Sequence, residues 1–230
     1  MRILIYPIIY KDKFGEEKAK ITTLGSTLHI KLRDTRFEGQ CFETLEISEF
    51  DNQENDKFEW EKYQDGSKIL TNFEMKVKFQ IQLAIEHNPQ MEKMIAQIST
   101  GNKKGSTVFL ELKTDFGNFK NTKNYDSFED ALLEIQSLLP QNTKIKTCVS
   151  CKFSNYHPIG NGMFGGLYCF KKIAHQVDRI VDKHSLLHFF DKEFDKDEEK
   201  QKIFNVQETF DCLEHRFLKE HEWTYKSWME

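Results

Sequence analysis

An alternation of apolar and polar residues between Phe73 and Ile85 constrains the fold more than any other feature of this sequence. Every second residue of the run is apolar, and lysine, glutamine and glutamate fill most of the positions between. A period of two places the apolar side chains on one face of a β-strand and the polar ones in water. Half-exposed strands of this kind are typical of antiparallel sheets. The run therefore predicts a mainly antiparallel sheet or sandwich.

Other runs in the first 125 or so residues extend the β prediction. Met91 to Ile98 fits a helix stripe or a strand, and we favour a strand that turns at residues 101–105 into a second strand at Val108–Leu112. Pro7 cannot donate to a ladder, so its strand is predicted at an edge or at a bulge. Further strands are predicted at Ile3–Ile9, Leu28–Leu32, Phe42–Ile47 and Phe58–Tyr63, the last ahead of an Asp65-Gly66 turn.

One helix is clearly marked at Phe128–Leu139. Ser127 precedes it as a cap, Asp130 completes a capping-box pattern, and Pro140 stops it. The fold class expected is α+β: an antiparallel sheet or sandwich, one long capped helix and a C-terminal zinc-binding part. We expect a β-rich domain over residues 1–140, ending in this helix, and an α/β part over residues 141–230 that packs on it.

Four cysteines in the second half have spacings suited to a metal ion. Cys148 and Cys151 form Cys-x2-Cys, Cys169 follows as a return ligand, and Cys212 is the natural fourth. Zn²⁺ takes four thiolates tetrahedrally at about 2.3 Å, and a site with four protein ligands is structural, because a catalytic zinc keeps one position open. The sequence thus predicts a structural zinc.

Other interpretations of these cysteines stay open. They include buried free thiols, since cysteine is among the most buried residue types, and redox use of the Cys-x2-Cys pair. His215 is the best substitute ligand, ahead of His157 and His175. Cys41 is far away in sequence, among apolar residues, and is expected to be a packed thiol.

Known catalytic patterns are not found. His184 and His188 share a helix face, but Ser185 stands where a zinc protease needs glutamate. Residues 158–166 are rich in glycine, yet no Gly-Lys-Ser/Thr follows, so tight turns around the metal knuckle explain them better than a phosphate loop. We expect a protein that is not an enzyme, with no membrane span and a cytoplasmic location.

The segment around the cysteines resembles a bacterial family of unassigned activity. The resemblance lies in Cys148-Val-Ser-Cys151 with the Ser-Asn-Tyr-His-Pro turn, in Phe164-Gly-Gly-Leu-Tyr-Cys169-Phe, and in Glu208-Thr-Phe-Asp-Cys212. It extends over roughly residues 70–215, with Leu213 where proline is expected. That family resembles immunity proteins found with bacterial polymorphic toxins. The resemblance implies an inhibitor that binds a cognate protein toxin.

Charge is distributed unevenly along the chain. The net charge of −4 disfavours a globally basic nucleic-acid binder. Residues 43–61 contain eight acids against one lysine, which suits either a solvated loop or a docking surface for a basic toxin. The candidate contact residues are Glu43, Glu46, Glu49, Asp51, Glu54, Asp56, Glu59 and Glu61.

The alternative function is a zinc-supported nucleic-acid-binding protein. Aromatic residues near the knuckle would stack bases while neighbouring lysines hold phosphates. The residues concerned are Phe153, Tyr156 and Phe170, with Lys144, Lys146, Lys152, Lys171 and Lys172. An enzyme with an unrecognised site is a third class.

Overall fold

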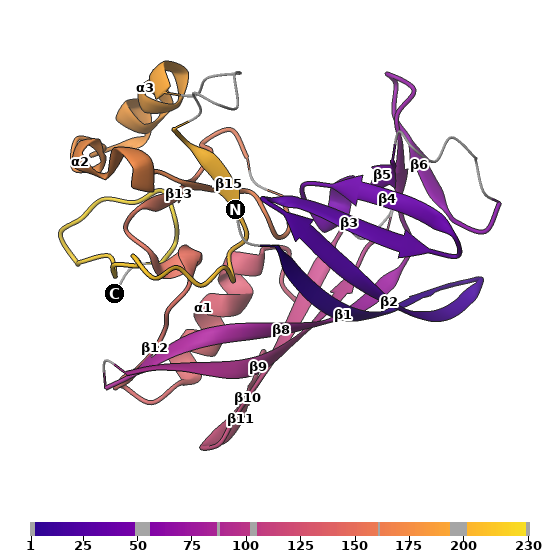
Figure 1. Cartoon of the computed structure of the whole chain (residues 1–230), viewed down its shortest axis with the longest axis horizontal. Helices are drawn as coiled ribbons and strands as arrows, with labels where there is room; N and C mark the ends of the chain where they lie inside the picture. The colour runs from indigo at the N-terminus through magenta and orange to yellow at the C-terminus, as the bar shows by residue number, and fades with distance from the viewer. Residues whose placement is uncertain are drawn as a thin grey trace.

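A large antiparallel sheet dominates the computed structural model (Figure 1). The structure describes residues 3–48, 56–86, 88–101, 105–160, 162–193 and 202–228. Within them, twelve strands join in this sheet. The strands are β1 (Leu4–Asp12), β2 (Gly15–Leu24), β3 (Thr27–Leu32), β4 (Thr35–Gly39), β5 (Glu46–Ile47), β6 (Trp60–Lys62), β7 (Lys68–Leu70), β8 (Glu74–Ile85), β9 (Asn88–Ser99), β10 (Thr107–Thr114), β11 (Gly117–Lys120) and β12 (Thr143–Ile145).

The sheet consists of two meanders that meet at β1 and β8. Its strand order is β11-β10-β9-β8-β1-β2-β3-β4-β5-β7-β6, and β12 also pairs with β8. The register of β8 with β9 runs from Glu74↔Ser99 to Ile85↔Asn88. β12 extends the sheet past residue 140, so the chain on both sides of the predicted boundary contributes to it.

The main strand predictions are confirmed. In β8 the side chains alternate between exposed and buried from Glu74 to Ile81. The segment around Met91–Ile98 is the strand β9 and not a helix, and it pairs antiparallel with β10. The predicted strand Leu28–Leu32 lies in β3. These strands have strong period-two patterns, which explains why the sequence identifies them.

Shorter strands depart from the predictions. Phe42–Ile47 is not one strand: a 3-10 turn, η1 (Phe42–Thr44), precedes the two-residue strand β5. The Phe42 N–H donates to the Met163 carbonyl oxygen at 3.3 Å, a contact from a distant segment that replaces strand pairing. The predicted strand Phe58–Tyr63 is realised as β6 only, and the predicted turn at Asp65-Gly66 is confirmed and joins β6 to β7. Strands β2, β4, β7 and β11 are not anticipated by the sequence.

Pro7 lies in a strand that is interior to the sheet as a whole, but its own position is locally an edge, in keeping with the prediction of an edge or a bulge. β1 pairs with β2 along its whole length, with Pro7 opposite Lys20. Its pairing with β8 begins only at Ile8. Pro7 thus occupies the half of β1 that has a neighbour on one side only, and its missing N–H is tolerated there.

The predicted helix is α1 (Phe128–Leu138), and it covers one face of the sheet. The Asp130 N–H donates to the Ser127 side-chain oxygen at 3.3 Å, as a helix cap requires. Phe128, Ala131, Leu132 and Ile135 are buried from α1. They share one core with the inward-facing side chains of β1, β8, β9 and β10.

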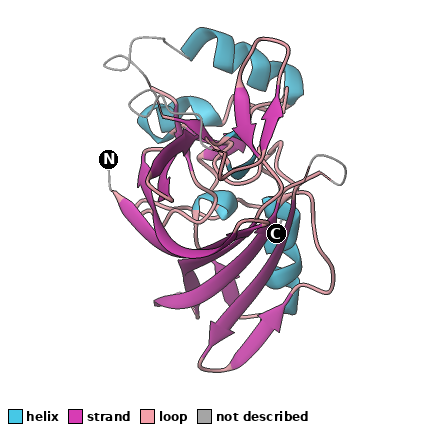
Figure 2. Cartoon of the chain, turned by 90° about the vertical axis from the view of Figure 1, so that its right-hand side faces the viewer, coloured by secondary structure: helices cyan, strands magenta, loops and turns pink. Residues whose placement is uncertain are grey.

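The C-terminal part is made of short elements on one side of the sheet (Figure 2). They include a three-stranded sheet in the order β13-β14-β15. The bounds are β13 (Ser154–Tyr156), β14 (Leu167–Cys169), β15 (Phe204–Val206), α2 (Ala174–Val177), α3 (Lys183–Glu193), η2 (Cys148–Ser150) and η3 (Lys171–Ile173). Of the helices in the described residues, none is long and apolar enough to cross a membrane.

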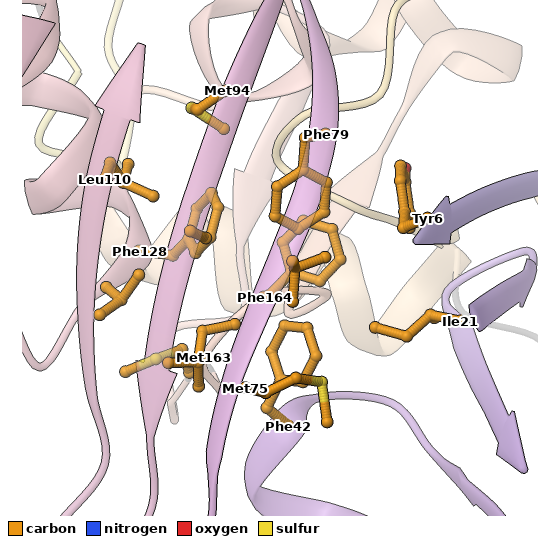
Figure 3. Packing of buried hydrophobic residues seen from close by; sticks show 14 of the residues in the cluster. Tyr6, Ile21, Phe42, Met75, Phe79, Met94, Leu110, Phe128, Met163 and Phe164 are labelled. Atoms are coloured by element: carbon orange, nitrogen blue, oxygen red, sulfur yellow. The ribbon is translucent and has the colours of Figure 1, made fainter. Parts of the chain in front are cut away.

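The glycine-rich loop between β13 and β14 inserts Met163 and Phe164 into the core of the large sheet (Figure 3). The Phe164 ring lies 4.9 Å from that of Phe79 and 5.0 Å from that of Phe128, measured between centroids. A Cβ at Gly165, which has φ +111°, would lie 2.2 Å from the Gln40 carbonyl oxygen. This glycine allows the loop to dock against the sheet. At Gly165, therefore, the expectation that the glycines form tight turns around the metal knuckle is wrong.

Candidate metal centre and acidic surface

The four cysteines of the predicted zinc site come from four short segments of the C-terminal part. Cys148 begins η2 and Cys151 follows it, with the Cys151 N–H donating to the Cys148 carbonyl oxygen at 3.2 Å. Cys169 ends β14. Cys212 lies after β15 in a segment without helix or strand. The first three thiols are buried and Cys212 is partly exposed.

Hydrogen bonds draw these segments together. The Ser154 hydroxyl lies against the carbonyl oxygens of Cys148 and Cys151, the latter at 3.0 Å. Ser154 is also the register partner of Cys169 in the β13–β14 ladder. The Cys148 N–H donates to the Phe210 carbonyl oxygen at 2.9 Å, two residues before Cys212. The local fold therefore brings all four cysteines into one region.

The thiols lie close enough to interact electrostatically, and burial disfavours the charged forms of Cys148 and Cys169. Burial raises the pKa of the Cys148 thiol well above its ordinary value, and Cys169, Cys151 and Cys212 raise it further. Burial raises the pKa of Cys169 to about 11, while a hydrogen bond from the Lys171 backbone opposes that rise. Among the described side chains, no group of three or more His, Cys, Asp or Glu is already arranged to hold a metal ion.

A buried lysine adjoins the cysteines, and sequence analysis did not single it out. Lys226 is 4% exposed. Its Nζ donates to the Cys151 carbonyl oxygen at 2.6 Å and to the Ser154 hydroxyl oxygen at 3.0 Å. Burial lowers the pKa of Lys226 to about 8, although Cys151 and Glu129 act in the opposite direction. No spacing in the sequence signals this lysine, which reaches the site from near the C-terminus.

His215 lies beside the same region but contacts Ser150. Its Nε2 is 3.0 Å from the Ser150 hydroxyl oxygen, and that hydroxyl donates to the Ile145 carbonyl oxygen at 2.7 Å. Burial lowers the pKa of His215 to about 4, so the ring is neutral. Its Nδ1 is buried without a hydrogen-bond partner in the structure. His215 therefore stays an alternative ligand.

The Ser150–His215 pair is not arranged as a nucleophile and its base. Nucleophilic hydrolases use such a pair when the serine is accessible to a substrate. Ser150 is 1% exposed, and its hydroxyl is shared between the carbonyl oxygens of Ile145 and Thr147. Through these hydrogen bonds the pair holds the backbone around η2 in place.

A buried carboxylate network links this part to the large sheet. Glu208 accepts hydrogen bonds from the Gly165 N–H at 2.8 Å and from the Tyr156 hydroxyl at 3.3 Å. Burial raises the pKa of Glu208 to about 7. Burial likewise raises the pKa of Glu129 in α1 to about 7, with Lys226 opposing the rise. Both glutamates hold loops in place, since Glu129 also accepts the Trp228 N–H at 3.2 Å.

The predicted acidic contact surface is only partly assembled. Its members Glu49, Asp51 and Glu54 lie outside the described residues. Of the others, Asp56 is exposed.

Glu43 and Glu59 are held by contacts within the chain. Glu43 accepts the Met163 N–H at 3.0 Å. Glu59 forms an ion pair with Lys13 at 3.1 Å. These two side chains therefore serve the fold as well as the surface.

Three glutamates lie in line across neighbouring strands: Glu38, Glu46 and Glu61. We call them the glutamate row. Glu46 is the register partner of Glu38 across β4 and β5. Glu46 and Glu61 are both partners of Ile69 in β7. Register partners on adjacent strands point to the same face, so the row lies on the outer face of the sheet. Sequence analysis missed Glu38 because only the strand pairing brings it beside Glu46.

The glutamate row borders a cavity of about 590 Å³. Glu38, Glu43 and Glu46 line it, together with Gly162 and Gly165 of the inserted loop. The Nδ1 atom of His29 lies 3.6 Å from a Glu38 carboxylate oxygen. Three carboxylates at one cavity create a negative potential that favours positively charged groups.

The aromatic residues proposed to stack bases are buried. Phe153, Tyr156 and Phe170 all lie in the cores of the C-terminal part. The lysines beside them have partners: Lys152 pairs with Glu222 at 2.6 Å. Lys171 pairs with Glu214 at 2.5 Å. Stacking needs an exposed ring face, and these rings do not offer one.

Comparison with known proteins places the chain in a family. No curated protein and no solved structure matches it. A family model described as a family of unknown function, DUF6304, matches residues 4–154. That match spans the large sheet and α1 and ends just beyond the Cys-x2-Cys pair, before Cys169 and Cys212. The chain therefore belongs to DUF6304, a family of unknown function.

Proposed function

We propose that this protein is a protein-binding inhibitor of the immunity type, which neutralises a cognate bacterial toxin in the cytoplasm. The glutamate row on the outer face of the sheet carries the proposal. The partner surface that fits it is basic, because potentials across protein interfaces are complementary.

The row is unfavourable for the fold by itself. Like charges directly opposite each other on neighbouring strands destabilise a sheet, and cross-strand pairs contribute roughly 0.2–1 kcal/mol. Glu38 and Glu46 are such a pair. A basic partner would relieve this repulsion, and its approach would be accelerated by the negative potential. A nuclease toxin, whose own surface must attract nucleic acid, has the required charge.

Nucleic-acid binding has less support. Its stacking residues are buried, and Lys152 and Lys171 are paired with carboxylates. Nucleic acid is polyanionic, so its approach to a chain of net charge −4 would also be unfavourable. A shift assay with single- and double-stranded nucleic acid at low salt tests this alternative directly.

The decisive experiment begins with the gene next to the one that encodes this chain. Its product should co-purify with the chain in a stoichiometric complex, and the chain should rescue cells from that product. A neighbour without toxic activity, together with no rescue from any candidate toxin, would refute the immunity function.

Variants of the row then test the surface. Replacing Glu38, Glu46 and Glu61 by glutamine should slow association with the toxin at least tenfold at low salt, and less at high salt. The matched control replaces three exposed glutamates outside the row, Glu16, Glu74 and Glu220, by glutamine. Both triple variants change the net charge equally, so an equal effect would show that position does not matter and would reject this surface.

A further inference from the structure

We propose that Cys148, Cys151, Cys169 and Cys212 bind one Zn²⁺ as a tetrathiolate centre and that Lys226 is its buried counter-cation. The inference concerns the C-terminal part and does not depend on the identity of the partner. Four protein ligands close the coordination shell, so the centre is structural.

The four segments that contain the cysteines converge. The Ser154 hydroxyl lies against the carbonyl oxygens of both cysteines of the Cys-x2-Cys pair, and Ser154 stands opposite Cys169 in the ladder. The Cys148 N–H donates to the Phe210 carbonyl oxygen, in the turn just before Cys212. The four cysteines, which lie far apart in sequence, are therefore held in one region by hydrogen bonds to their own backbone or to that of neighbouring residues. Packed free thiols do not require such an arrangement.

Lys226 has the charge that complements a tetrathiolate zinc. Lys226 is 4% exposed, its hydrogen-bond partners are a carbonyl and a hydroxyl oxygen, both neutral, and Glu129 is a carboxyl group that acts on it electrostatically. A buried ammonium group is costly unless an anion compensates it. Zn²⁺ with four thiolates has a net charge of −2, and the hydrogen bond from Lys226 to the Cys151 carbonyl places the ammonium group near these thiols. The centre and the lysine thus compensate each other.

Binding requires the thiols to close around the ion. The described side chains are not yet arranged as a coordination shell. Cys212 is the partly exposed member, in a segment held by turns from Gln207 to Phe210 and from Cys212 to His215. Because no three of the described ligand side chains form such a group, more than one thiol must move toward the ion on binding. Each thiol loses its proton to solvent, so one Zn²⁺ displaces four protons and the affinity falls in acid.

The first test is metal content. The full chain, purified without chelator, should contain about one zinc per molecule. Cys148→Ser and Cys212→Ser should each lose it, and Cys41→Ser should keep it, because Cys41 contacts Thr44 and lies outside the cluster. Wild-type protein without zinc that also takes up none when Zn²⁺ is added would overturn the proposal. So would zinc retained in Cys212→Ser but lost in His215→Ala, since the histidine would then be the ligand.

Co²⁺ replacement gives a readout that does not need stable variants. The wild-type chain should show the absorption of tetrahedral cobalt with four thiolates, and a spectrum of octahedral cobalt or of fewer thiolates would reject the ligand set.

The lysine is tested by competition for zinc against a chromogenic chelator. Lys226→Met should keep one zinc per chain but bind it more weakly, on the order of tenfold or more, as is found when outer-shell partners are removed. Lys62→Met, at an exposed lysine, is the matched control. Equal affinity in Lys226→Met and wild type would overturn the counter-cation. If Lys226→Met does not fold, Lys226→Gln keeps a donor for the Cys151 carbonyl without the charge and takes its place.

Discussion

The large sheet and the C-terminal part are stabilised in different ways. The sheet rests on long strands such as β8, whose alternating side chains bury one face and expose the other. The C-terminal part has strands of three residues, and side chains such as Ser154, Glu208 and Lys226 hold its backbone by hydrogen bonds. Regular patterns thus encode the first region, and single polar contacts encode the second.

The two regions meet at the loop that contains Met163 and Phe164. The loop belongs to the C-terminal part in sequence, yet both side chains lie in the core of the sheet. The adjacent Gly165 N–H donates to Glu208 at 2.8 Å. At this loop an apolar insertion and a buried carboxylate couple the regions, and variants at these residues show how strongly.

The largest effect is expected from Phe164→Ala. The ring is fully buried and contacts the rings of Tyr6, Phe42, Phe79 and Phe128. Its removal leaves a cavity, and such truncations cost about 3–5 kcal/mol. Urea unfolding followed by far-ultraviolet circular dichroism should show this loss in the free energy of unfolding.

Phe170→Ala is the comparison for Phe164→Ala. Phe170 is equally buried, but in the core of the C-terminal part beside Phe189 and Phe190. If the loop couples the regions, Phe164→Ala should lower the protection of backbone amides from hydrogen exchange both in β8 and in β14. A loss confined to β14 would show that the insertion does not support the sheet.

Gly165→Ala should have the next largest effect. Alanine there must adopt φ +111°, and its Cβ would lie 2.2 Å from the Gln40 carbonyl oxygen, which is backbone and cannot rotate away. Strain of this kind costs about 1–3 kcal/mol before the steric clash is added, so we expect at least about 2 kcal/mol in urea unfolding. Gly160→Ala in the same loop is the control, because no atom lies within 4 Å of its added Cβ. Equal stability of the two variants would contradict the proposed docking.

The sequence predicted the parts of the sheet whose residues repeat every second position. Strand β2 was missed because its first six residues are mostly charged and its buried side chains, Ile21 and Thr23, come only near its end. The predicted strand at Phe42–Ile47 failed because Met163, far away in sequence, binds the backbone there. Local patterns cannot report contacts of this range.

The candidate sites show the same limit. The spacing of Cys148 and Cys151 is a local signal, and it led to the cluster that the fold brings together. Lys226 has no such signal, since it is identified only by its burial and by its contact with the Cys151 carbonyl. Glu38 was likewise found only from the register of β4 with β5. Long-range polar contacts, which define the C-terminal part, are what sequence analysis could not supply.

The stability of the chain should depend on pH through Glu208, the carboxylate that joins the regions. The pKa of Glu208 is about 7 in the folded protein, against 4.5 ordinarily. Between these pH values the folded chain keeps the proton and the unfolded chain releases it. The free energy of unfolding therefore falls as pH rises through this window, by up to about 1 kcal/mol per pH unit for one such group.

Glu208→Gln should remove this contribution. Glutamine offers an oxygen to the Gly165 N–H and an amide to the Tyr156 oxygen, so the contacts of Glu208 are preserved without the charge. Urea unfolding from pH 5 to pH 8 should give a flatter profile than wild type, with the variant relatively more stable at the upper end. The exposed Glu16→Gln should keep the wild-type profile. Parallel profiles for Glu208→Gln and wild type would contradict the raised pKa.

The smallest effect tests whether the outer face of the sheet is under strain from its own charges. Glu46 faces Glu38, so Glu46→Gln should increase stability at low salt by roughly 0.2–1 kcal/mol. The gain should vanish near 1 M salt, where the Debye length is only about 3 Å. Glu74→Gln is the matched control of opposite sign, since Glu74 is the register partner of Lys11 and lies 4.0 Å from its Nζ. If Glu46→Gln destabilises the chain as Glu74→Gln does, the row is not repulsive, and the argument that it awaits a basic partner loses its energetic basis.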